Sequence, residues 1–103
     1  MKHVKLYEQY LNEAKSLDRD EMIKWIEQFA DRVRPSEEFN GNEGGIWVCG
    51  ECGYEYKGKL MYWNHTREKA YELGVLKAWE KELNKRGWWS EWHDAGTVMI
   101  WPN

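Results

Sequence analysis

The sequence has little cysteine, little proline and no long apolar run, and each shortage excludes a class of protein. Its 103 residues include two Cys and two Pro, too few for a disulfide-rich secreted scaffold or a proline-rich segment. No run approaches the ~18 apolar residues of a membrane-spanning helix. The opening residues carry Glu8 and Glu13, where a signal peptide needs an uninterrupted apolar core. We therefore expect an intracellular protein with no membrane partner.

An excess of basic charge is also lacking. The chain has 15 Lys plus Arg against 18 Asp plus Glu, a net charge of −3. Proteins that bind duplex nucleic acid usually carry a basic stripe, so nucleic acid is not expected to be the main partner. Residues 45–103 hold seven of the eight Trp and both Cys. Any specialised chemistry is therefore expected in the second half of a single domain.

The first half of the chain predicts helices followed by a linker. Apolar residues recur every three or four positions in the opening segment, which is typical of an amphipathic helix. A second helix is expected to begin at Asp18, with Glu21 completing a capping box, and to end at Arg34-Pro35. The polar, glycine-rich residues 36–45 predict a flexible linker or loop. The predicted organisation is a possible leader or first helix (1–13), a helical segment (14–35), the linker (36–45) and an aromatic-rich core (46–103).

The second half predicts two hairpins separated by a long helix. Residues 54–63 are expected to form a hairpin that turns at Lys57-Gly58-Lys59. A helix should follow from Asn64 or Thr66 to about Arg86 and end at Gly87. The last segment predicts a hairpin that turns at Asp94-Ala95-Gly96. The expected fold class is α+β, in which both hairpins share one antiparallel sheet, the long helix packs on it, and the N-terminal helices complete the domain.

The opening residues MKHVKLYEQYLNE, followed by Ala14, carry a resemblance to a known group of proteins. They resemble the short amphipathic leader of small internal and accessory proteins of large tailed phages. In that group the leader directs the protein into the prohead, and a protease cuts after the Glu of a Leu-x-Glu motif. The matching residues here are Leu11, Asn12 and Glu13, which would make Ala14 the new amino terminus. The resemblance implies a phage protein located in the host cytoplasm or packaged in the phage head. The alternative is a first helix that packs on the domain.

Residues 46–58 contain the sharpest local motif, a Cys-x-x-Cys turn after a predicted strand. Cys49 and Cys52 could point both sulfurs at one tetrahedral metal, and Gly53 allows the turn. The run from Trp47 to Tyr56 resembles the first knuckle of rubredoxins and zinc-ribbon proteins, which implies zinc or iron. Those families complete the site with a second Cys pair. This chain has no third cysteine, so the resemblance covers half a site.

Histidines are the candidates for the missing ligands. Twelve residues separate Cys52 from His65, which is the gap before the first His in two-Cys two-His fingers. His93 is the candidate fourth ligand, so the predicted metal set is Cys49, Cys52, His65 and His93. The alternatives are two reduced thiols, a knuckle completed across a dimer interface, or thiol–disulfide chemistry. The last needs the first Cys at a helix N-terminus, whereas the residues after Cys52 favour a strand.

Aromatic residues of the second half predict a binding surface. Strand alternation places Trp88 and Trp92 on one side and Trp89 on the other. Because both sides carry indoles, we expect some of them to be exposed for a ligand or partner. The candidate surface comprises Trp88, Trp89, Trp92, Tyr54, Tyr56 and Tyr62. The alternative for each indole is a place in the core.

Three functions are consistent with these features. The first is a non-enzymatic binding or accessory protein that acts on a host macromolecule, with a protein as the expected partner. The second is a zinc-knuckle protein that binds single-stranded nucleic acid through aromatic side chains and nearby lysines and arginines. The third is a small metal- or thiol-dependent enzyme using Glu91, His93 and the two thiols. Because no spacing specifies a reaction, the binding function is the main prediction, and the sequence leaves the partner and the oligomeric state open.

Overall fold

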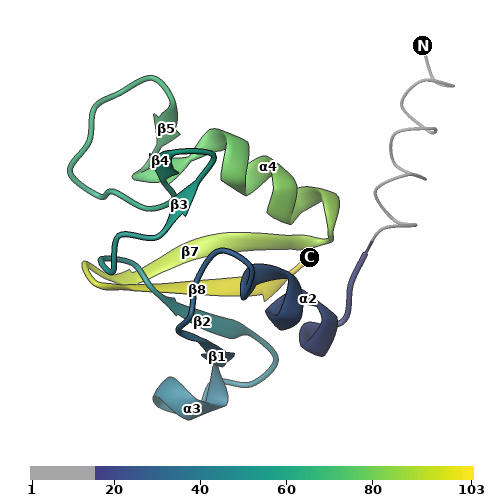
Figure 1. The fold of residues 1–103 in the computed structure, drawn as a ribbon. Coiled ribbons are helices and arrows are strands. Elements are labelled where there is room, and N and C mark those ends of the chain that lie inside the picture. Colours follow the sequence, from purple (N-terminus) through teal and green to yellow (C-terminus); the bar gives the residue numbers. More distant parts are fainter. Residues whose placement is uncertain (1–15) are drawn as a thin grey trace, which may run out of the picture.

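The computed structural model describes residues 16–103 and has the α+β fold class that the sequence predicts (Figure 1). Its centre is an antiparallel sheet with the strand order β1-β2-β8-β7. These strands are β1 (Val33–Pro35), β2 (Ile46–Cys49), β8 (Thr97–Pro102) and β7 (Trp88–Asp94). The predicted leader and its Glu13–Ala14 cleavage site lie outside the described residues. Within the described part, no helix is long and apolar enough to cross a membrane.

Helix α2 (Arg19–Ile26) begins where the sequence predicts and ends earlier. The capping box is present, because Asp18 accepts a hydrogen bond from the Glu21 N–H and Glu21 accepts one from the Asp18 N–H. The predicted continuation to Arg34 is wrong. Val33–Pro35 instead forms β1, which pairs with β2 through Val33 and Val48. Proline is tolerated in β1 because this strand lies at the edge of the sheet.

The hairpin expected in residues 54–63 is present, but it does not belong to the main sheet. Strands β3 (Glu55–Tyr56) and β4 (Lys59–Leu60) form a separate two-stranded ribbon. Lys57 and Gly58 connect them with φ values of 51° and 85°, the geometry of a two-residue type I′ turn. The prediction that both hairpins share one sheet is therefore wrong.

The long helix predicted from residue 64 to residue 86 is wrong in its first half. Residues 71–76 form a second ribbon, β5 (Tyr71–Glu72) and β6 (Val75–Leu76), and only Lys77–Lys85 is helical, as α4. The turn at Leu73 and Gly74 needs φ values of 50° and 78°, which no right-handed helix contains. The C-terminal hairpin is present as predicted, with Asp94 paired to Thr97 across the turn.

The hydrophobic core lies between one face of the sheet and helices α2 and α4. Ile46 pairs with Ile100 in the sheet, and these side chains are fully buried. Trp25 of α2 stacks on Trp79 of α4 with ring centroids 5.3 Å apart. Three residues predicted on a binding surface also belong to this core, where burial of their rings removes them from the surface: Trp88, Tyr56 and Tyr62.

Candidate functional site

The second face of the sheet is rich in aromatic side chains. Residues directly opposite each other in an antiparallel pair project on the same face. One row across the four strands therefore reads Arg34, Trp47, Met99 and Glu91, and Trp89 pairs with Trp101 beside it. We call the following residues the aromatic sheet face: Phe39, Trp47, Trp89, His93, Met99 and Trp101.

Met99 shows that this face has its own apolar cluster. Its side chain is 2% exposed, yet it does not belong to the core that packs against α2 and α4. Its chain neighbours Val98 and Ile100 do belong to that core, so Met99 projects from the opposite face of the strand. Met99 is therefore buried by its surroundings on the second face, which neither α2 nor α4 covers.

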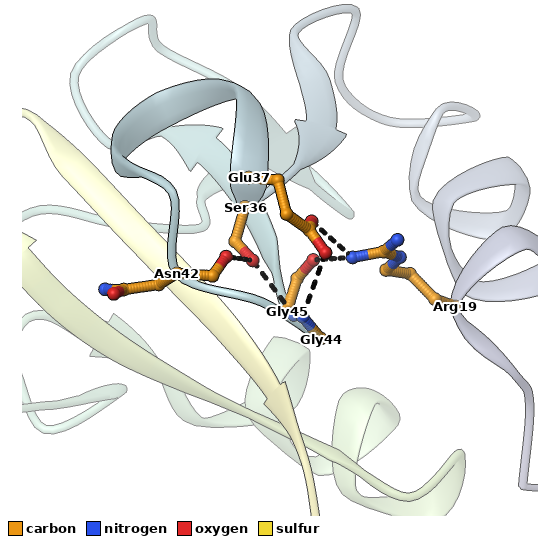
Figure 2. Close-up of polar contacts among 6 residues, drawn as sticks. All are labelled: Arg19, Ser36, Glu37, Asn42, Gly44 and Gly45. Carbon is orange, nitrogen blue, oxygen red and sulfur yellow. Dashed lines mark hydrogen bonds and ion pairs between the residues drawn. The ribbon is translucent and has the colours of Figure 1, made fainter.

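The segment predicted as a linker builds one border of this face. It contains the short helix α3 (Glu37–Asn40), and Figure 2 shows the polar contacts that hold it. Ser36 is fully buried, and its hydroxyl donates to the Asn42 carbonyl at 2.6 Å and accepts from the Gly45 N–H at 3.0 Å. The segment is therefore an ordered loop that contains a short helix, which agrees with the loop alternative and not with a flexible linker.

An ion pair joins this loop to α2 (Figure 2). Arg19 Nη1 lies 2.6 Å from Glu37 Oε1 and also donates to the Gly45 carbonyl, and the Gly44 N–H donates to Glu37 Oε2. The hydrogen bond from its own backbone N–H, followed by those from Arg19 and Gly44, lowers the pKa of the Glu37 carboxyl. The carboxylate form therefore holds α3 in position beside the sheet.

Helix α3 places Phe39 on the aromatic sheet face. The Phe39 ring contacts the Trp47 ring at a centroid distance of 5.5 Å and meets the His93 ring edge-on at 5.0 Å. Phe39 remains 38% exposed. The Trp47 indole N–H is buried and has no acceptor among the described residues. This aromatic trio links α3, β2 and β7 in one continuous surface.

Trp101 packs against the backbone of the sheet beside this trio. A Cβ on Gly45 would sit 2.5 Å from two ring carbons of Trp101, so the indole rests directly on the backbone. At the other end of the ring, Nε1 donates to Glu91 Oε1 at 3.0 Å. Trp89, directly opposite Trp101, is 36% exposed. Two indoles and an exposed carboxylate therefore stand together at this edge of the sheet.

The structure does not bring the four predicted metal ligands together. Cys49 and Cys52 are joined by a disulfide, so neither sulfur is a thiolate ligand in this state. His65 lines a cavity of about 270 Å³ beside Gly50 and Glu51, whereas His93 contacts Phe39 on the aromatic sheet face. Across residues 16–103, no group of three or more His, Cys, Asp or Glu could hold a metal ion. Zinc or iron binding stays a prediction, which applies to the reduced protein.

The remaining surface predictions have separate locations. Trp92 is half-buried, and its indole donates to the Leu73 carbonyl at 2.8 Å and meets Tyr62 edge-on. The half-buried Tyr54 donates a hydrogen bond from its hydroxyl to Asp31.

Of the six residues predicted to form a binding surface, Trp89 lies on the aromatic sheet face. The sequence reasoning missed four members: Phe39, Trp47, Met99 and Trp101. Alternation in β2 and β8 indicates three of these, but nothing local indicates Phe39.

A second cavity, of about 430 Å³, lies between α4, β7 and the turn between β5 and β6. Glu80 Oε2 accepts from the Ser90 N–H at 3.0 Å, while Oε1 is buried and has no partner among the described residues. The Ser90 hydroxyl is 2.9 Å from the Tyr62 hydroxyl, to which the Trp79 indole donates. Burial raises the pKa of Tyr62 far above its ordinary value. These hydrogen bonds join α4 to β7 beside the cavity.

No family model, curated protein or solved structure matches this chain.

Proposed function

We propose that this protein is a non-enzymatic binding module that engages a polypeptide partner through the aromatic sheet face. The supporting observation is the second apolar cluster around Met99, which neither α2 nor α4 covers. Phe39 and Trp89 keep more than a third of their surface exposed within it. Large aromatic side chains of this kind are the usual anchors of protein interfaces.

The charges on this side favour a polypeptide over nucleic acid. Exposed Glu38 and Glu43 lie on α3 and the loop after it, and Glu91 lies on the face itself. Arg34 is the cationic residue in the same row. Phosphate groups would be repelled by this acidic border, whereas a basic polypeptide would be attracted to it. Action on a host protein by a phage-encoded protein stays within this proposal and depends on the resemblance of the leader.

Selection of peptides from a displayed random library on the immobilised full chain tests this proposal. We expect enriched peptides whose affinity falls at least about tenfold in the double variant Phe39→Ser/Trp89→Ser. Trp63→Ser is the matched control, because Trp63 is 40% exposed and lies outside this face. Its affinity should change by less than about twofold. Thermal melting of each variant identifies any loss of fold.

Two results would overturn the proposal. The first is a selection in which no peptide prefers the natural chain over the folded double variant. The second is enriched peptides whose binding depends on Trp63 and not on Phe39 or Trp89. Enrichment of single-stranded oligonucleotides with the same dependence on Phe39 and Trp89 would instead support the nucleic-acid alternative.

A further inference from the structure

We propose that Trp89, Glu91 and Trp101 form a guanidinium-binding subsite, so that the polypeptide partner presents an arginine side chain to it. This inference rests on the proposed function and specifies the chemistry of the partner. The three residues lie on adjacent strands, with Trp89 opposite Trp101 and Glu91 two positions after Trp89. Residues two apart on a strand share a face, so both indoles lie in the cross-strand row next to the carboxylate.

The Glu91 carboxylate is already oriented for a ligand. Its Oε1 accepts a hydrogen bond from the Trp101 indole, which leaves Oε2 for another donor. Glu91 is exposed and makes no ion pair with another described residue. Arg34 stands at the far end of the same row, roughly 14 Å away at three strand spacings. A cation from outside this row is therefore needed to pair with Glu91.

The Trp101 ring provides a flat surface beside that carboxylate. It lies against Gly45, where a Cβ would collide with the ring, and its N–H is fixed on Glu91. The ring therefore has little freedom to rotate. An indole is the best aromatic partner for a cation, and the planar guanidinium can stack on a ring while its N–H groups reach a carboxylate.

The same combination of groups occurs elsewhere in this molecule with its cation in place. The Arg86 guanidinium lies 3.9 Å from the ring centroid of Trp25. It also donates to Glu82 Oε1 at 3.0 Å. Arg86, Trp25 and Glu82 thus show an arginine that stacks on an indole and pairs with a neighbouring glutamate. Trp89, Trp101 and Glu91 present the indoles and the carboxylate, and no arginine of residues 16–103 pairs with them.

Titration with N-acetyl-arginine methylamide tests the subsite directly on the full chain. The indole N–H resonances of Trp89 and Trp101 in ¹H–¹⁵N spectra report binding. We expect the Trp101 resonance to shift, because its N–H contacts Glu91. The citrulline analogue has nearly the same shape without the charge, and it should bind at least about fivefold more weakly. The lysine analogue should fall between them, since an ammonium cannot stack as a plane.

Variants separate the charge from the aromatic surface. Glu91→Gln keeps an acceptor for Trp101 and removes the charge, so affinity for the arginine compound should fall at least about fivefold. Trp89→Leu keeps an apolar side chain and should weaken binding by a similar factor. The matched control is Glu55→Gln, an exposed glutamate on β3 in the separate ribbon, which should leave affinity within about twofold. Melting curves confirm that each variant is folded.

Equal affinity for the arginine and citrulline compounds, or unchanged affinity in Glu91→Gln, would overturn the subsite. So would arginine binding that shifts neither indole resonance. Peptides that bind the aromatic sheet face without arginine would remove this inference and leave the proposed function standing. Absence of any peptide that depends on Phe39 or Trp89 would remove the proposed function itself, whatever the result with the arginine compound.

Discussion

The Trp101 indole lies directly on Gly45, so close that a Cβ there would sit 2.5 Å from Cε3 and Cζ3 of the ring. Because the Ile100 carbonyl oxygen is also within 3.1 Å of that Cβ position, a side chain at residue 45 cannot be accommodated without displacing the ring. The Trp101 ring can therefore occupy this position because residue 45 is a glycine.

Gly45→Ala should destabilise the protein by about 1–3 kcal/mol, the usual cost of overpacking a close contact. The displaced indole would also lose its hydrogen bond to Glu91. Urea denaturation measures the change. In a Trp101→Ala background the same substitution should cost much less, because the clash is gone. Equal costs in both backgrounds would show that the contact with Trp101 is not the reason for glycine.

Glu37 should make stability depend on pH in the acidic range. Its pKa in the folded protein is lowered from 4.5, so the carboxylate form favours folding. The stabilisation is fully present above the unfolded pKa and is lost as the pH falls through the lower, folded pKa. Glu37→Gln should therefore lower the urea midpoint at pH 7, and this difference should shrink as the pH falls through the acidic range. Arg19→Met should show the same pH pattern, because Arg19 is the cation that pairs with Glu37. A midpoint difference that is constant across this range would contradict the prediction.

The sequence predicted the parts of the fold that local chemistry specifies. The capping box of α2 and the turn of the C-terminal hairpin involve residues within a few positions of each other. The end of α2 depends instead on pairing between Val33 and Val48, which apolar spacing along one segment cannot reveal. Val33 fits the apolar spacing of the predicted helix, and it equally fits the edge strand β1 in which it lies.

The aromatic sheet face was only partly predictable for the same reason. Alternation in β7 separated Trp89 from Trp88, as the exposures of these residues confirm. Phe39 reaches the face because Ser36, Gly45 and Arg19 hold the loop that carries it. Those contacts join residues that are not neighbours in the chain. The glycine-rich composition of residues 36–45 does not predict them.

The disulfide between Cys49 and Cys52 should contribute little to stability. It closes a loop with a sequence separation of 3, and so short a loop restricts the unfolded chain by about 2 kcal/mol at most. The double variant Cys49→Ser/Cys52→Ser should remain folded and lose no more than this in urea denaturation. A variant that does not fold would contradict the expectation and give the knuckle a larger structural role.

Metal binding is tested on the reduced protein. Elemental analysis of protein purified under reducing conditions should show zinc or iron if the Cys-x-x-Cys prediction holds, and the double serine variant should show none. A content below about a tenth of an equivalent in the reduced natural chain would contradict it, since a structural site is coupled to folding and retains its metal.

Removal of the Tyr62 hydroxyl should destabilise the folded protein more than removal of the Tyr54 hydroxyl. The buried Tyr62 hydroxyl accepts a hydrogen bond from the Trp79 indole and shares a second hydrogen bond with the Ser90 hydroxyl. Tyr62→Phe leaves the buried Trp79 N–H without its acceptor, which should cost about 1–3 kcal/mol. Tyr54→Phe is the matched control, because the Tyr54 hydroxyl bonds Asp31 at the exposed surface and its loss should cost no more than about 1 kcal/mol. Urea denaturation of both variants gives the comparison. Equal losses would mean that water satisfies the Trp79 N–H once the phenol oxygen is removed.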